Sequence, residues 1–307
     1  MIFFIELAVS FVIIMVNTVQ QGNNYIFYHG PCHDGELAAA IWRQENQDAK
    51  FITYQHHMKE DAIKILGTLP AGTHVVFLDV CPAIEHLNGS LNYLIIDHHK
   101  DAVEKLNSFL MEFHPTNITL VADTTKSGCQ LTWEFCHPDT QMPKSVIHIG
   151  NKDIWNWNNP DTEPFTLGYP LFPNSAYPIE RMEEILCWDD EKVGQAIEIG
   201  KTKITEFRAK AETYFSEYYS TELTDGTRTF NVLSLDCPEY PLYKYILEHA
   251  KTCKEYEGFD ILRIVQEKDG KFCYSLRAIK NVTVDGVARH YGGNGHPKAA
   301  GYAVTIE

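Results

Sequence analysis

The sequence has few basic residues for its length. It holds 26 lysines and arginines against 41 aspartates and glutamates, which gives a formal charge of −15 over 307 residues. Because nucleic-acid backbones bind to basic surfaces, this charge excludes long duplex nucleic acid as the main partner. A short anionic substrate held by metal ions remains compatible with it.

The sequence also lacks any C-x-x-C pair, although it contains eight cysteines. Scattered single cysteines in a chain of this size indicate reduced thiols better than a disulfide framework or a structural zinc site. Reduced thiols favour the cytoplasm as the location of the protein.

No lysine or arginine precedes Arg43, so the apolar run at residues 1–17 lacks the positive region of a secretory signal. Glu6 and Ser10 interrupt this run, which is shorter than the ~20 apolar residues of a membrane-spanning helix. We expect residues 1–22 to be an apolar extension, either an extra helix or an over-long start with Met15 as an alternative initiator. A weak signal or anchor, which would make the protein secreted or membrane-anchored, ranks second, and a spanning helix ranks last.

Between residues 24 and 135 short apolar runs alternate with helix-like segments. This alternation predicts an α/β fold whose parallel sheet carries helices on both faces. The expected strands are 24–30, 50–55, 74–80, 91–99 and 118–123, and the expected helices are 36–46, 60–69, 101–110 and 127–135.

The rest of the chain predicts a linker and a second domain. A long helical pattern between about residues 189 and 219 indicates a helical connector. Beyond residue 225 the pattern restarts with a strand, a helix, a hairpin turning at Asp269-Gly270, and a final strand. We therefore expect a first domain at 23–186, a helical linker at 187–224 and a smaller α/β C-terminal domain at 225–307.

Imidazoles and carboxylates follow successive strands of the first domain. These residues are His29, Asp34, Asp79, His98 and, further on, Asp153. Taken singly, the aspartates have ordinary alternatives, since Asp79 could cap a helix, Asp34 could sit in a turn and Asp153 in a loop. Ligands of such sheets bind beyond the carboxyl ends of the strands, and this donor set suits Mn²⁺ or Mg²⁺. The joint pattern predicts a metal site.

The motifs HGPCHDG, FLDV, DHH, KDIWNW, YSLRA and GGNGHPKAAGY occur in this order. In that order the chain, from about residue 24 to its end, resembles the DHH phosphoesterase family, which includes RecJ-type nucleases, nano-RNases, cyclic-dinucleotide phosphodiesterases and family II pyrophosphatases. The branch built like nano-RNases is the most similar. The resemblance implies a two-metal-ion enzyme that activates water for in-line attack at phosphorus.

The resemblance also implies a role for each metal-site residue. Two ions, Mn²⁺ or alternatively Mg²⁺, would be bridged by Asp79. His29 would serve the first ion, and Asp34, His98 and Asp153 the second.

Beside these ligands, His99 would orient the substrate or stabilise its charge, and Asp97 would orient the histidines. One departure concerns the first motif, because family members carry D-x-D-G where this chain has Cys32-His33-Asp34-Gly35. His33, slightly ahead of Cys32, would replace the missing acid.

The C-terminal motifs imply a substrate-binding domain. Arg277 and the loop residues Gly292, Gly293, Gly295 and His296 would grip a phosphate or the end of a nucleotide. Arg289 is a further candidate. The ordinary alternative for the glycines is a tight turn before the last strand.

Two aromatic residues follow Asp153 closely. Trp155 and Trp157 could stack a base at the mouth of the site. Tryptophans spaced in this way are more often part core and part surface, so we expect a core role for both. Ser127 is expected to cap a helix, and the cysteines to be small core residues.

Together these features predict a phosphoesterase that hydrolyses phosphodiester bonds of short oligonucleotides or small nucleotides, as an oligoribonuclease does. One alternative is hydrolysis of 3′-phosphoadenosine phosphate or polyphosphate, and another is a non-catalytic nucleotide-binding relic of the fold. A short oligonucleotide or a small phosphate ester is the expected partner, and a homodimer stays open.

Overall fold

The computed structural model describes residues 25–55, 59–173, 175–237 and 239–306. The expected apolar extension at residues 1–22 lies outside these ranges. Within them, no helix has both the length and the apolar character needed to cross a membrane. The chain divides into two compact units, Met1–Lys201 and Thr202–Glu307.

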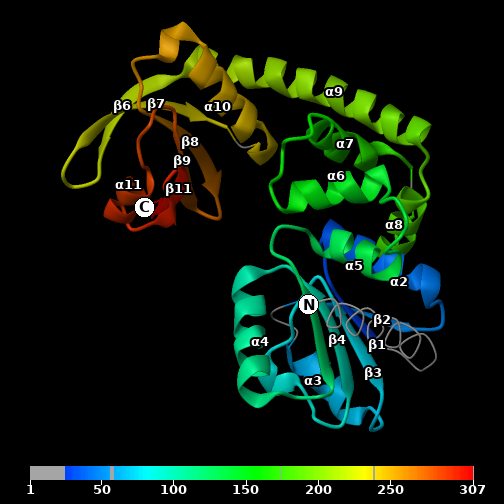
Figure 1. The fold of residues 1–307 in the computed structure, drawn as a ribbon. Helices are drawn as coiled ribbons and strands as arrows, with labels where there is room; N and C mark the ends of the chain where they lie inside the picture. The colour runs from blue at the N-terminus through cyan, green and yellow to red at the C-terminus, as the bar shows by residue number, and fades with distance from the viewer. Residues whose placement is uncertain (1–24, 56–58, 174, 238, 307) are drawn as a thin grey trace, which may run out of the picture. The chain divides into compact units, whose positions relative to one another are not determined.

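The first unit is built on a parallel sheet of five strands in the order β2-β1-β3-β4-β5 (Figure 1). This confirms the predicted α/β class. The strands are β1 (Tyr25–His29), β2 (Lys50–Tyr54), β3 (His74–Leu78), β4 (Asn92–Asp97) and β5 (Ile118–Ala122).

Helices cover both faces of this sheet. Successive side chains of a strand point to opposite faces, so each strand contributes to two separate cores. Phe27, Val75 and Phe77 pack on one face with the helices α3 (Lys59–Thr68) and α4 (Lys100–Phe113). Ile26, Val76 and Leu78 pack on the other face. The helices there are α2 (His33–Glu45) and α5 (Gly128–Cys136).

Further helices extend the second of these cores. They are α6 (Lys144–Asp153), α7 (Thr162–Gly168), α8 (Pro178–Leu186) and the start of α9 (Asp190–Thr213). Ser127 begins α5 with a capping box, because its hydroxyl accepts from the backbone N–H of Gln130 while the Gln130 side chain accepts from the N–H of Ser127. The predicted cap is therefore confirmed.

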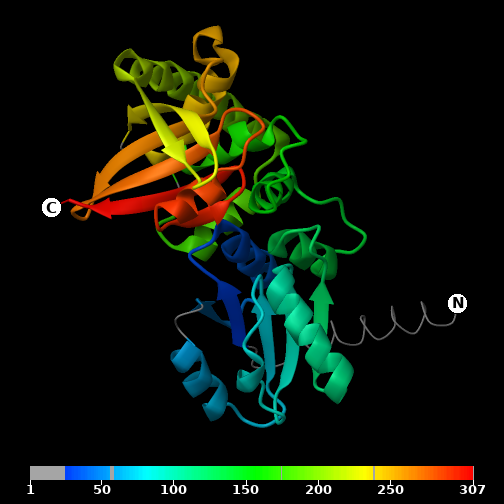
Figure 2. The same cartoon turned by 90° about the vertical axis from the view of Figure 1, so that its left-hand side faces the viewer.

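The second unit carries a mixed sheet of six strands in the order β10-β11-β9-β8-β7-β6. Its helix α11 (Asp285–His290) packs on one face of this sheet (Figure 2). The opposite face buries Leu233 and Leu262. The other elements are β6 (Tyr219–Thr224), β7 (Thr229–Asp236), α10 (Tyr243–Thr252), β8 (Ile261–Lys268), β9 (Lys271–Ala278), β10 (Asn294–His296) and β11 (Ala299–Thr305).

Two sequence expectations differ from the structure. The helical connector ends at Thr213, and the strand β6, inside the range expected as linker, pairs with β7 in the second sheet. Trp155 and Trp157 are not core residues, since 78% and 41% of their surfaces are exposed. A pattern of apolar residues does not distinguish a buried ring from one held at the surface by its neighbours.

Candidate metal centre

The strand ends bring the predicted polar residues together. His29 ends β1, Asp79 follows β3, and Asp97 ends β4. Because the strands are parallel neighbours, their carboxyl ends meet at one edge of the sheet. The ordinary alternative for Asp79 does not hold, since the short 3₁₀ helix at Ile84–His86 begins after Ala83.

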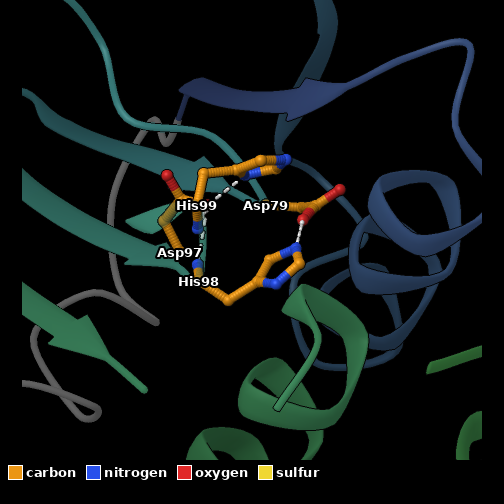
Figure 3. Close-up of side chains that lie close together, drawn as sticks. All are labelled: Asp79, Asp97, His98 and His99. Carbon is orange, nitrogen blue, oxygen red and sulfur yellow. Dashed lines mark hydrogen bonds and ion pairs between the residues drawn. The ribbon is translucent and has the colours of Figure 1, made fainter. Parts of the chain in front are cut away.

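Asp79 lies at the centre of the cluster and is 1% exposed. Its Oδ2 is 3.2 Å from His29 Nδ1, and its Oδ1 is 3.1 Å from His98 Nε2. Figure 3 shows the side chains of Asp79 and His98 pointing toward one another. Asp79 also has a φ of 59°, a left-handed conformation that is uncommon outside glycine and that concentrates at functional sites.

His98 faces two more carboxylates. Its Nε2 is 3.3 Å from Asp153 Oδ2 and 3.7 Å from Asp34 Oδ2. Asp34 lies in the first turn of α2, and Asp153 is the last residue of α6, so neither belongs to the loop or turn that the sequence allowed as an alternative. The structure therefore brings the candidate set His98, Asp34, Asp79 and Asp153 together.

Asp97 organises the two histidines that follow it (Figure 3). Its Oδ1 accepts the backbone N–H groups of His98 at 2.7 Å and of His99 at 3.2 Å, and it lies 2.7 Å from His99 Nδ1. The hydrogen bond to Asp97 raises the pKa of His99. Asp97 is fully buried, and its contact with Nδ1 holds the imidazole of His99 in one orientation. The His99 side chain is nevertheless 41% exposed.

The helix α5 contributes contacts that sequence reasoning missed. The backbone N–H groups of Gly128 and Cys129 donate to the two carboxylate oxygens of Asp34, at 2.7 and 3.0 Å. Gly128 is required there, because a Cβ would lie 2.5 Å from the Cβ of Asp79. The serine and glycine at the predicted helix start were the available signal, since a helix N-terminus offers free N–H groups to an anion.

The two candidates for the missing acid have different surroundings. Cys32 Sγ lies close to His29 and Asp79 and is 4.0 Å from Asp153 Oδ1. His33 Nδ1 instead contacts the hydroxyl of Tyr169, and burial lowers the pKa of His33 to about 4. The structure thus places Cys32 in the cluster, and the preference for His33 loses its support.

The charges of the cluster fit a divalent cation. Burial raises the pKa of Asp34 well above its ordinary range, and the charges of Asp79 and Asp153 raise it further. Burial also disfavours the charged form of Asp79, but the imidazoles of His29 and His98 beside it hold its pKa at about 2. Three carboxylates and the imidazoles of His29 and His98 therefore share one site, and its buried carboxylates are stable in their charged form only beside positive charge.

Buried polar atoms that make no hydrogen bond give a further test of this fit. Among the described residues they include Asp97 Oδ2, and also Asp79 Oδ1 and His98 Nε2, which lie 3.1 Å apart without hydrogen-bond geometry. Such an atom is costly when buried, and ligation of a cation would satisfy Asp79 and His98 together. Fold and site define the class: a two-unit α/β protein with a candidate metal centre at the carboxyl edge of its parallel sheet.

The second unit contains an open surface cavity of about 590 Å³ that includes two of the predicted substrate residues. Arg277 and Gly295 line it together with four tyrosines that sequence reasoning missed: Tyr240, Tyr243, Tyr274 and Tyr302. Burial lowers the pKa of Arg277, and the described residues include no carboxylate paired with it. A partly buried, unpaired guanidinium suits an anionic ligand.

The other predicted residues of the C-terminal loop have different surroundings. Gly292 and Gly293 are not among the residues that line the cavity, and His296 is exposed in β10. A Cβ at Gly293 would lie 2.0 Å from the carbonyl oxygen of Gly301, so this glycine is required by the backbone. Arg289 donates to Asp285 at 2.8 Å within α11, which engages its charge.

No family model matches the chain. Among curated proteins the chain is similar to the uncharacterised protein R106 of Acanthamoeba polyphaga mimivirus, at 26% identity over 310 aligned residues. The match covers 91% of this chain and 67% of that protein.

Solved structures of several kinds of protein have partial similarity to the chain, among them the following three. A pGpG-specific phosphodiesterase, PggH from Vibrio cholerae, has a TM-score of 0.46 at 13% identity, covering 93% of this chain and 94% of its own. CDC45 from Entamoeba histolytica has 0.48 at 7%, covering 96% of each chain. RecJ from Thermus thermophilus, in complex with Mg²⁺, has 0.39 at 12%, covering 96% of this chain and 49% of its own.

Proposed function

We propose that this chain is a metal-dependent phosphoesterase of the DHH type that hydrolyses phosphodiester bonds of short oligonucleotides or small nucleotides. The observation that carries the proposal is the position of Asp79. Its two oxygens face two separate groups of ligands, with His29 and Cys32 on one side and His98 on the other.

Each group of ligands would hold one divalent cation. His29, Cys32 and Asp79 would hold the first, and Asp34, His98 and Asp153, with Asp79 shared, would hold the second. Carboxylate and imidazole donors suit Mn²⁺ or Mg²⁺. When bound, such cations make water a better nucleophile near neutral pH and stabilise negative charge on a phosphoryl group.

The chain's own residues set the orientation of the reacting groups. Nδ1–H of His99 donates to Asp97, which leaves Nε2 as the ring nitrogen that can meet the substrate. Because Asp97 raises the pKa of His99, the protonated form is favoured, and its positive charge would stabilise a phosphoryl oxygen. Gly128 and Cys129 keep Asp34 in place.

The second unit would bind a phosphate or the end of a nucleotide. Arg277 offers a guanidinium that matches the geometry of a phosphate. Gly295 lines the same cavity, and without a side chain it would let the ligand contact the backbone. A short ligand of a few nucleotides suits this arrangement better than a duplex, because the charge of the whole chain is −15.

A hydrolysis panel with Mn²⁺ tests the proposal. The substrates would be a ladder of short RNA oligonucleotides from the dinucleotide upward, a cyclic dinucleotide, 3′-phosphoadenosine phosphate and polyphosphate, with Asp79→Ala as the control. We expect short RNA or the dinucleotide to be cleaved by the wild type and not by the variant. Cleavage of polyphosphate or 3′-phosphoadenosine phosphate alone would instead support a polyphosphatase or a phosphomonoesterase. No cleavage at all, together with uptake of at most one Mn²⁺ in calorimetry, would favour a binding protein without catalysis.

A further inference from the structure

Trp155 is a large apolar side chain held at the surface beside the candidate metal centre. It follows the metal-site residue Asp153 by two positions, so their Cα atoms are at most about 7 Å apart. Its surface is 78% exposed. Its ring contacts that of Trp157, with centroids 6.1 Å apart and planes at 83°. Its burial therefore does not account for a tryptophan at this position.

The backbone of Trp155 makes this position more unusual. Trp155 has a φ of 56°, and its N–H donates to the carbonyl of Lys152 at 3.2 Å. The next N–H, that of Asn156, donates to the carbonyl of Asn151 at 2.8 Å. These two bonds form a Schellman motif that ends α6, and Trp155 occupies the left-handed position where glycine is the usual residue.

A tryptophan at this position costs stability in two ways. A side chain with a Cβ is strained in the left-handed conformation, and an indole exposed to water gains little from burial. Glycine would end the helix without either cost. Residues held in strained backbone conformations are enriched at functional sites.

The chemistry of an exposed indole indicates what it would bind. Its face stacks on nucleobases without regard to sequence, and the nearest charged residue before it in the chain is Asp153 of the cluster. A phosphate at the metal centre of a nucleotide substrate carries its base one sugar away. Polyphosphate, which is a phosphoanhydride, and base-free phosphate esters have no group that would stack on the indole.

We propose that Trp155 is a specificity-determining residue that stacks on the base next to the reacting phosphate, so that the substrate is a base-bearing nucleotide or oligonucleotide. The inference rests on the proposed phosphoesterase function and deepens it by naming the residue that would select a substrate with a base. Trp157, whose ring meets that of Trp155 edge-on, supports the orientation of the indole.

The experiment compares AMP with ribose 5-phosphate, which differ only in the base. Calorimetry of the full chain with Mn²⁺ would give both affinities for the wild type, Trp155→Gly, Trp155→Phe and the control Tyr177→Ala, another exposed aromatic residue of the first unit. We expect the wild type and Tyr177→Ala to prefer AMP by about tenfold or more. Trp155→Gly should lose most of this preference, Trp155→Phe should keep part of it, and the Tm of Trp155→Gly should equal or exceed that of the wild type.

Two results would overturn the inference: a wild type that binds AMP and ribose 5-phosphate equally, or a Trp155→Gly variant that keeps the full preference. If Trp155→Gly unfolds, Trp155→Asn replaces it, because asparagine tolerates the left-handed conformation. Hydrolysis of a dinucleotide by the wild type is measured separately. Its absence would count against the proposed function, whereas the AMP preference alone decides the role of Trp155.

Discussion

The two units hold their charged groups in opposite ways. In the first unit, carboxylates are buried together, and Asp34, Asp79 and Asp97 are each at most 1% exposed. In the second unit, one guanidinium, that of Arg277, lies among tyrosines with no carboxylate paired to it in the described residues. The first arrangement attracts a cation, and the second attracts an anion.

This difference would allow an acidic chain to act on an anionic substrate, as the proposed function requires. Buried like charges are stable only when something neutralises them, so positive charge stabilises the carboxylate cluster of the first unit. The second unit holds Arg277 where no carboxylate of the described residues neutralises it. The comparison predicts that changes in the first unit act on metal binding and turnover, and that changes in the second unit act on substrate affinity.

The largest expected effect is on metal binding and turnover in the first unit. Asp79→Asn removes the charge that both groups of ligands share, so we expect turnover to fall by about a thousandfold or more. A chelator should have the same effect on the wild type. Calorimetry with Mn²⁺ measures the number of ions bound. Retention of two bound ions by Asp79→Asn would contradict the shared position of this residue.

A smaller but still large effect is expected at Gly128. Gly128→Ala would place a Cβ 2.5 Å from Asp79 Cβ, and overpacking of this kind costs about 1–3 kcal/mol. We expect turnover to fall by roughly a hundredfold because Asp79 and Asp34 are displaced. Gly67→Ala in α3 is the matched control, since no atom lies within 4 Å of its Cβ. Equal activity of both variants would show that the packing against Asp79 has no functional weight.

The expected role of the second unit in substrate affinity is tested at Arg277. Loss of a charged hydrogen-bond partner costs about 1.5–3 kcal/mol, so Arg277→Ala should raise KM by roughly ten- to a hundredfold with a smaller change in kcat. Arg277→Lys should lie between, because it keeps the charge and loses the planar geometry. Arg228→Ala, outside the cavity, is the control. A drop in kcat without a change in KM would place Arg277 outside substrate binding.

A more moderate effect concerns Cys32 and the identity of the first cation. Thiolate prefers softer metals than carboxylate does, so Cys32→Ser should weaken Zn²⁺ binding about tenfold and Mn²⁺ binding less. The exposed Cys187→Ser is the matched control. Calorimetry with each metal gives the comparison. Unchanged binding of both metals would exclude Cys32 as a ligand.

The smallest expected effect is on the pH dependence of stability and concerns His148, a histidine of the first unit that is buried away from the metal cluster and whose neutral form is favoured by burial. Burial lowers its pKa below the ordinary 6.5, so below pH 6.5 the unfolded chain binds a proton that the folded chain does not. Stability from this residue is therefore present above pH 6.5 and is lost as the pH falls, by at most about 1.4 kcal/mol per pH unit.

The His148→Asn variant should lose this part of the acid sensitivity while keeping a polar contact to Thr162. Urea unfolding between about pH 5 and about pH 7.5, roughly the range over which an ordinary histidine titrates, measures the difference. Identical pH slopes for wild type and variant would show that His148 ionises alike in both states.

Much of the fold and of the cluster could be predicted because local pattern carries it. Apolar runs ending in His29, Asp79 and Asp97 are visible in the sequence, and parallel strands then bring their ends to one edge. Repeats of apolar residues also predicted helices on both faces. The strand β6 was not predicted, because its mostly exposed residues lack a clear alternation of apolar and polar side chains.

What only the tertiary structure decided is how distant segments meet. The contact of Gly128 with Asp34 joins residues 94 positions apart, and the turn of His33 toward Tyr169 joins residues 136 apart. The sequence by itself determined which residues form the candidate site and at which strand ends they lie, because side-chain type and strand periodicity are local. Packing decided which of them face the cluster and which, like Trp155, stand exposed, because burial depends on neighbours that sequence order does not reveal.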